Sequence, residues 1–176
     1  MKRRITVSVT LDARTFRRFA FFDTFVIKKR GRKPVLFSLI QLVFAVAALW
    51  LRKEQSGMIA AVLLVIGLGL PILYIGTFMS QLNLQAERFK LGKGRKVYTV
   101  TLENSGVTVH NLQQEEETLR LSWDDVWRVY RRKSCVYLYA SPAKAFLLPS
   151  GQADAPDQAI LEALKEKLPS SKLFLS

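Results

Sequence analysis

The chain has 176 residues, with 27 Lys and Arg against 14 Asp and Glu, and a formal net charge of +13. The excess lies in residues 1–34 (11 basic, 2 acidic) and 80–96 (5 basic, 1 acidic), whereas residues 97–176 have 9 basic and 10 acidic side chains. A nucleic-acid-binding domain would carry a basic face on its folded part. Nucleic acid is therefore not an expected partner, except through a basic N-terminal arm.

Residues 5–11 alternate apolar and polar side chains, which is typical of a strand with one buried face. A single strand is not stable alone, so we expect it to join a sheet formed by the C-terminal part. Asp12 can cap a helix that runs on to a group of basic residues. The phenylalanines and arginines of this helix do not form one stripe. Two interpretations stay open: an interfacial helix at a membrane, or a helix packed on the soluble domain.

Two runs without a charged residue follow, at 35–51 and 58–79. As helices they would be roughly 26 and 33 Å long, against about 30 Å for the core of a bilayer. We predict a transmembrane helical hairpin; the alternative is two buried helices of a soluble core. No Asp, Glu, Lys, Arg or His lies inside either run, which favours an anchor over a transport path. Small residues should let the helices approach closely, and Pro71 should kink the second helix.

The flanking charges set the predicted orientation. Basic residues lie before the first run and after the second, whereas the joining segment has only Arg52 and Lys53 beside Glu54. Both termini should therefore face the cytoplasm, in an inner-membrane protein with two spans. We call the group before the first run the basic cluster; it consists of Lys28, Lys29, Arg30, Arg32 and Lys33. It is the candidate contact for anionic lipid headgroups, the alternative being that it only sets the topology.

Residues 96–176 have the pattern of a small cytoplasmic β domain, after a polar connector at 80–95 that begins as a helical extension. Strand-like segments separated by turn signals lie at 96–102, 107–111, 118–123, 126–133, 136–140 and 144–148. An amphipathic helix then starts near Asp154 or Asp157 and is stopped by Pro169. This order indicates an α+β or mainly-β, PH-like barrel or sandwich, capped by the C-terminal helix and completed by the N-terminal strand. The predicted parts are thus residues 1–34, 35–79, 80–95 and 96–176.

Three segments resemble a known family: LSWDDV at 121–126, VYLY at 136–139 and FLLP at 146–149. The chain resembles the YcxB-like membrane proteins, which have a tryptophan before an acidic pair, an aromatic-rich strand, and an apolar pair followed by proline. The resemblance extends over most of the chain. It implies an N-terminal strand, a basic stretch, a two-helix hairpin and a PH-like domain, and it implies no reaction.

No catalytic, cofactor or metal site is predicted. One histidine, His110, and one cysteine, Cys135, cannot make a usual zinc set or a disulfide. Cys135 is expected in the core. Asp124 and Asp125 are adjacent and should point to opposite faces of an extended chain, so we expect one of them to cap a turn.

Other conspicuous residues have structural interpretations. Trp123 and Trp127 are expected to pack, and the acidic residues 115–117 to form a solvated turn. A second basic run at 131–133 could contact headgroups or peptides, by fold analogy alone.

These observations predict a non-enzymatic inner-membrane protein. Its PH-like domain would bind a partner protein, a second copy or lipid at the cytoplasmic face. The alternative is an accessory subunit of a transport or envelope-assembly complex that acts through the hairpin.

Overall fold

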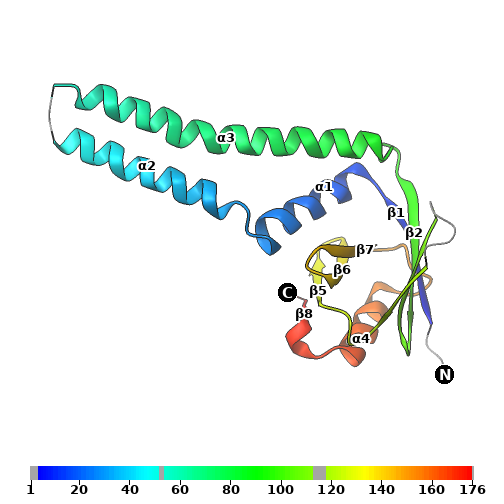
Figure 1. Cartoon of the computed structure of the whole chain (residues 1–176). Coiled ribbons are helices and arrows are strands. Elements are labelled where there is room, and N and C mark those ends of the chain that lie inside the picture. The colour runs from blue at the N-terminus through cyan, green and yellow to red at the C-terminus, as the bar shows by residue number, and fades with distance from the viewer. Residues whose placement is uncertain (1–3, 52–53, 113–117, 176) are drawn as a thin grey trace. The chain divides into compact units, whose positions relative to one another are not determined.

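The computed structural model describes residues 4–51, 54–112 and 118–175, and the chain divides into two units. One unit combines Met1–Phe16 with Lys90–Ser176, and the other is Arg17–Phe89. The strands lie in the first unit, and the two long apolar helices lie in the second (Figure 1). An N-terminal strand and a distant C-terminal domain therefore belong to one folded body.

The first unit contains two four-stranded sheets. The first has the order β1-β2-β3-β4, all antiparallel: β1 (Ile5–Leu11), β2 (Arg95–Glu103), β3 (Gly106–Asn111) and β4 (Thr118–Ser122). The second has the order β7-β6-β5-β8: β5 (Arg128–Arg132), β6 (Cys135–Ser141), β7 (Lys144–Pro149) and β8 (Leu173–Phe174), with β8 parallel to β5. Of the predicted barrel or sandwich, the structure shows two separate sheets, and the described strands do not close into a barrel. Among the described strands no ladder joins β4 to β5, because the turn after β4 carries the chain into the other sheet.

The N-terminal strand joins the first sheet, which confirms that prediction. β1 pairs with β2, and Ile5, Val7, Val9 and Leu11 are all buried. Its other edge bonds the chain after β7: the Ser8 amide donates to the Gln152 carbonyl at 3.2 Å. The Asp154 amide likewise donates to the Thr6 carbonyl at 2.9 Å. β1 is thus hydrogen-bonded on both edges: by a full ladder to β2 on one, and by a single antiparallel bridge between Val7 and Ala153 on the other.

The C-terminal helix α4 (Asp157–Lys167) follows the sheets, as predicted, and buries Ile160, Leu161 and Leu164. After Pro169 the chain makes a short 3₁₀ turn, η2 (Ser170–Lys172), and then β8. The ring of Phe174 stacks on Tyr130 of β5 at a centroid distance of 4.8 Å. This last strand was not predicted from the sequence.

The helical part begins with α1 (Ala13–Phe21) and the π-helix η1 (Phe22–Ile27). Asp12 caps α1 as predicted, because its Oδ1 accepts the Thr15 amide at 2.8 Å. Hydrogen bonds from the Thr15 side chain and from its backbone amide lower the pKa of Asp12 below its ordinary value. The helix predicted after Asp12 therefore exists, but its last turn widens into a π-helix before the basic cluster.

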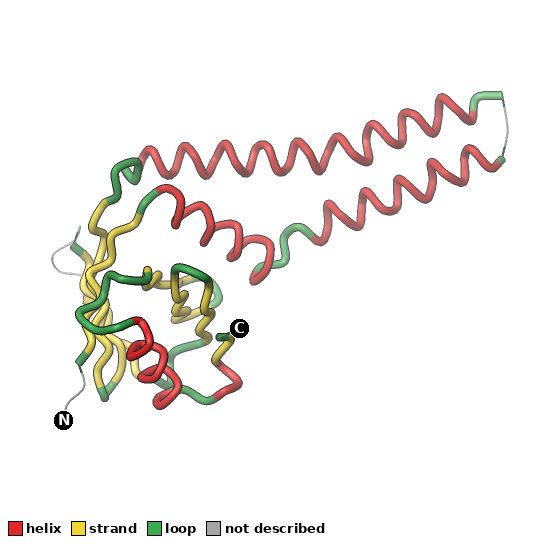
Figure 2. The backbone as a smooth tube through the Cα atoms, turned by 180° about the vertical axis from the view of Figure 1, so that it is seen from behind, coloured by secondary structure: helices red, strands yellow, loops and turns green. Residues whose placement is uncertain are grey.

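The two apolar runs form α2 (Arg32–Trp50) and α3 (Ser56–Arg88), which run side by side in opposite directions (Figures 1 and 2). Both are long and apolar enough to cross a membrane. At about 1.5 Å per residue α3 is roughly 50 Å long, so its C-terminal end extends beyond the apolar run as the helical extension predicted for the connector.

One contact sets how closely α2 and α3 approach. Pro71 has no N–H, so the Gly67 carbonyl lacks the donor that the next turn of α3 would supply. The Ser38 hydroxyl on α2 lies 2.6 Å from this oxygen and donates to it. Gly67 also leaves room for Gln41, because a Cβ at Gly67 would lie 2.8 Å from the Cβ of Gln41.

Candidate functional site

The basic cluster lies where η1 turns into α2. Lys28 follows η1 directly, and Arg32 and Lys33 open α2. Backbone hydrogen bonds fold the intervening turn: the Arg30 amide donates to the Thr24 carbonyl at 3.0 Å. The Arg32 amide donates to the Lys29 carbonyl at 3.1 Å. This turn therefore presents the cluster on ordered backbone.

Two unusual positions shape this turn. Lys29 has φ 52°, in the left-handed region that is uncommon for residues other than glycine. Gly31 lies against the ring of Phe25, and a Cβ there would be 2.8 Å from Phe25 Cδ1. Gly31 is therefore required by a close approach, and the turn is folded back onto the aromatic ring that precedes it.

Aromatic contacts fix η1 to α3 next to the cluster. The Phe25 ring meets Phe78 edge-on at 5.2 Å and Tyr74 at 6.4 Å. Phe21 stacks on Phe25 and also meets Phe78, each at 5.2 Å. A further bond joins Arg17 to Asn83 of α3 at 3.0 Å. Phe21 and Phe25 thus pack on α3. Neither of the two interpretations of this segment, an interfacial helix or a helix packed on the soluble domain, included that contact.

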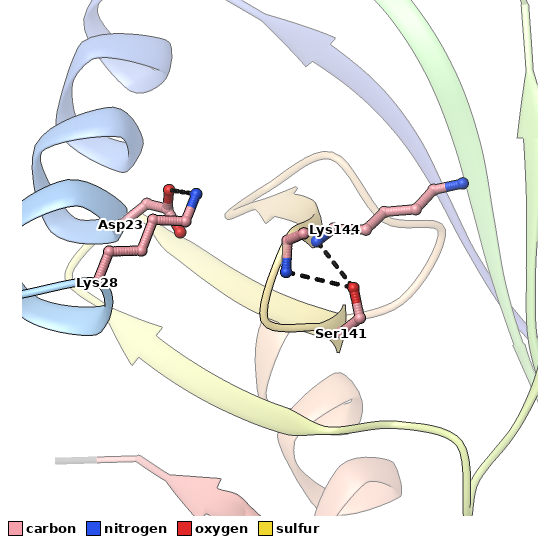
Figure 3. Close-up of polar contacts among 5 residues, drawn as sticks. Asp23, Lys28, Ser141 and Lys144 are labelled. Atoms are coloured by element: carbon pink, nitrogen blue, oxygen red, sulfur yellow. Dashed lines mark hydrogen bonds and ion pairs between the residues drawn. The ribbon is translucent and has the colours of Figure 1, made fainter.

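The structure divides the basic cluster into two kinds of residue. Lys28 Nζ lies 2.6 Å from Asp23 Oδ2 and forms an ion pair within the η1 turn (Figure 3). The other four cations are exposed, and no carboxylate of the described residues pairs with them. The first turn of α2 contains no acidic residue. Four unpaired cations and the positive end of a helix dipole therefore attract anions to one place.

The other sequence candidates have structural partners. His110 is exposed on β3, with Nδ1 3.1 Å from Thr118 Oγ1. Asp125 closes the turn after β4, because the Ser122 hydroxyl donates to its Oδ2 at 2.9 Å. That hydrogen bond confirms that one of the two aspartates caps a turn. Within the part of the chain that the structure describes, no group of three His, Cys, Asp or Glu side chains could hold a metal ion.

Both tryptophans pack, as predicted. Trp123 Nε1 donates to the Glu103 carbonyl at 3.0 Å, and the Trp127 ring meets Tyr139 at 5.9 Å. The guanidinium of Arg128 lies 4.6 Å from the Trp127 ring centroid. The second basic run, at 131–133, is exposed at the end of β5. The predicted acidic turn at 115–117 lies outside the described residues.

Cys135 is buried, as predicted, and burial raises the pKa of its thiol to about 12. Sequence reasoning missed Tyr98, whose hydroxyl links the two sheets. The Leu147 amide donates to Tyr98 Oη at 2.7 Å, and Oη lies 3.3 Å from the Leu147 carbonyl. Burial raises the pKa of Tyr98 above its ordinary value. The sequence feature that could have indicated this role is a tyrosine within a predicted strand, because a buried tyrosine hydroxyl needs a hydrogen-bond partner.

A small pocket opens beside this hydroxyl. It has a volume of about 240 Å³, and its lining includes Tyr98, Asn111, Lys144 and Phe146. The turn that leads to Lys144 is closed by Ser141, whose Oγ accepts the Lys144 amide at 3.1 Å (Figure 3). The Lys144 ammonium lies 5.7 Å from the centroid of the Phe146 ring, so this charged group is already in contact with the wall of the pocket.

Fold and site together define a class of protein: a domain of two sheets and a C-terminal helix, joined to a pair of apolar helices with a basic cluster at its start. A family model described as YcxB-like protein matches residues 104–166. The match confirms the resemblance for the segment from the turn before β3 into α4. β1, the basic cluster and the apolar helices lie outside it. We found no match among curated proteins or solved structures.

Proposed function

We propose that the protein is anchored in the inner membrane by α2 and α3, a transmembrane hairpin that holds a PH-like domain at the cytoplasmic face. The observation that carries the proposal is the exposure of the apolar helices. Only 6% of the residues in the most apolar window of α2 and 11% of those in α3 are buried. Core helices of a soluble protein would be largely covered, whereas a bilayer would cover these side chains.

The PH-like assignment of the domain is part of this proposal. Seven strands, β1 to β7, followed by one amphipathic helix, support it. The exposure of His110, Asp124 and Asp125 supports a binding role over catalysis, because catalytic side chains usually lie in a cleft. The partner would be a protein, a second copy of the chain, or lipid, and nucleic acid is not proposed.

The basic cluster has two tasks in this proposal. The positive-inside rule places both chain termini in the cytoplasm, because the charges lie before α2 and after the apolar run of α3. Each base near an anionic leaflet also contributes about 1 kcal/mol to membrane contact. Lys28 contributes less than the other members because Asp23 neutralises it.

Photo-crosslinking of the full chain in native membranes tests the binding role. One crosslinker replaces Arg131, exposed on the domain, and a matched one replaces Val65, exposed on α3. We expect a defined protein adduct from position 131 and only lipid adducts from position 65. Protein adducts from position 65 alone would contradict the proposal.

Protein adducts from position 65 alone would favour the alternative, an accessory subunit of a transport or envelope-assembly complex. One observation supports this alternative. Gly69 and Gly76 are spaced seven apart on α3, and neither would bring a Cβ within 4 Å of another group. Small residues on an uncovered helix face would allow close packing of a helix from another chain.

A further inference from the structure

A groove lies between the start of α2 and the middle of α3. It has a volume of about 480 Å³, within the size range of small-molecule sites. Its lining includes Lys33, Phe37, Leu70, Leu73, Tyr74 and Thr77. Because the helices run in opposite directions, Lys33 and Thr77 lie near one end, and Phe37 and Leu70 lie about one to two turns deeper. The groove is thus apolar along its length and basic at one end.

Two packing contacts bracket this groove along α3. On one side the helices touch where Ser38 binds the Gly67 carbonyl. On the other side the Phe25 ring packs against Tyr74 and Phe78. Pro71 lies between the two contacts and lines the groove. The groove is therefore a defined feature of the helix pair and not a general property of its apolar surface.

The charged end of the groove carries an unpaired cation. Among the described residues no carboxylate pairs with Lys33, which lines this end. Tyr74, one turn before Thr77 on α3, also lines the groove. Thr77 is already engaged, since its hydroxyl lies 2.9 Å from the Leu73 carbonyl. An unpaired lysine at one end of an apolar groove, with a tyrosine in its lining, complements a phosphate that carries an acyl chain.

We propose that the groove binds one anionic glycerophospholipid. Its phosphate lies on Lys33, its ester region reaches Tyr74, and one acyl chain follows Phe37, Leu70 and Leu73. This proposal rests on the proposed membrane location of α2 and α3. A helix of a partner protein is the less suitable occupant, because a helix covers a long stripe and carries no phosphate for the lysine at one end.

Native mass spectrometry of the full chain in detergent tests the proposal, with phosphatidylglycerol and phosphatidylcholine as probes. The wild type should retain one phosphatidylglycerol in preference to phosphatidylcholine, and glycerol phosphate without a chain should not compete. Leu70→Trp fills the groove without changing charge and should abolish the first adduct. Val65→Trp, 72% exposed on the same helix, is the matched control and should retain it.

The headgroup contact has its own pair of variants. Lys33→Gln should weaken phosphatidylglycerol binding by about fivefold and reduce the preference over phosphatidylcholine. Lys29→Gln, an unpaired member of the basic cluster that does not line the groove, should change both much less. Equal effects of the two substitutions would mean that the cations act as a diffuse charge, and would overturn the proposed site.

A measurement on the wild-type chain avoids any variant that fails to fold. Phosphatidylglycerol with a photoreactive acyl chain should crosslink to Phe37, Leu70 and Leu73. Crosslinks spread evenly over the outer faces of α2 and α3 would overturn the groove while leaving the membrane anchor intact. Failure of the anchor itself would appear separately, as loss of the protein from the membrane fraction.

Discussion

Replacing Ser38 by alanine should loosen the contact between α2 and α3, and the size of the effect should depend on Pro71. The Gly67 carbonyl has no donor in its own helix, and the Ser38 hydroxyl at 2.6 Å takes that place. An unsatisfied buried polar group costs about 1–3 kcal/mol, whereas interhelical hydrogen bonds in membranes contribute about 0.6–1.7 kcal/mol. We therefore expect Ser38→Ala to lower the free energy of helix separation by about 1 kcal/mol.

A double-mutant cycle isolates the cause. In a Pro71→Ala background the restored backbone N–H can donate to the Gly67 carbonyl, so Ser38→Ala should then have little effect. The predicted coupling energy between the two positions is again about 1 kcal/mol. The result would identify the hydroxyl as the partner of a carbonyl that proline has freed.

The assay follows helix separation directly in the full chain. Dyes on Val43→Cys and Val65→Cys, side chains that are 66% and 72% exposed, report energy transfer as the mole fraction of SDS rises. Cys135→Ser removes the native thiol from labelling. An equal loss of stability from Ser38→Ala with and without Pro71 would refute the reasoning.

Three further predictions concern stability. Val7→Asp, at a position with 0% exposure in β1, should remove about 1.5–3 kcal/mol of apolar burial and expose the C-terminal domain to proteolysis. Ser8→Asp, on the exposed face of the same strand, should not. Equal resistance of the Val7→Asp variant and the wild type to the protease would place β1 elsewhere. Gly67→Ala should lower the mole fraction of SDS at which the helices separate, because its Cβ would lie 2.8 Å from the Cβ of Gln41. Gly76→Ala, whose Cβ would have no group within 4 Å, should leave that mole fraction unchanged. A larger effect of Gly76→Ala than of Gly67→Ala would contradict the contact. The raised pKa of Cys135 disfavours its thiolate in the folded protein, so the free energy of unfolding should fall as pH rises from about 9 toward about 12. Iodoacetamide should label the native protein far more slowly than the unfolded protein at about pH 8. Equal labelling rates would contradict the burial of Cys135.

Much of the fold followed from local patterns. The alternation at residues 5–11 predicted β1 because only one of its faces is buried, and the two uncharged runs predicted α2 and α3 because their composition is uniform. The strands of the C-terminal domain lay near their predicted segments for the same reason. The residue pattern left a barrel and a sandwich open, because strand pairing between β4 and β5 depends on the direction of one turn, which no residue pattern specifies.

Other features depend on contacts that sequence spacing does not reveal. β8 has two residues and is held by a ladder to β5 and by the stacking of Phe174, so no periodicity could announce it. In the candidate site, all five cations of the basic cluster were predicted as equals. The ion pair of Lys28 with Asp23 exists because the η1 turn brings the two together, and that turn is a π-helix. The roles of Phe25 and Tyr74 beside the cluster likewise required the packing of η1 on α3.

The orientation of the hairpin is the central claim of the account, and cysteine accessibility in intact cells tests it most directly. A cysteine at Ser56, where α3 begins, should react with a membrane-impermeant maleimide added outside. A cysteine at the exposed Ser150 of the domain should react only after the membrane is permeabilised. Labelling of Ser150→Cys in intact cells, with Ser56→Cys protected until permeabilisation, would contradict a domain held at the cytoplasmic face.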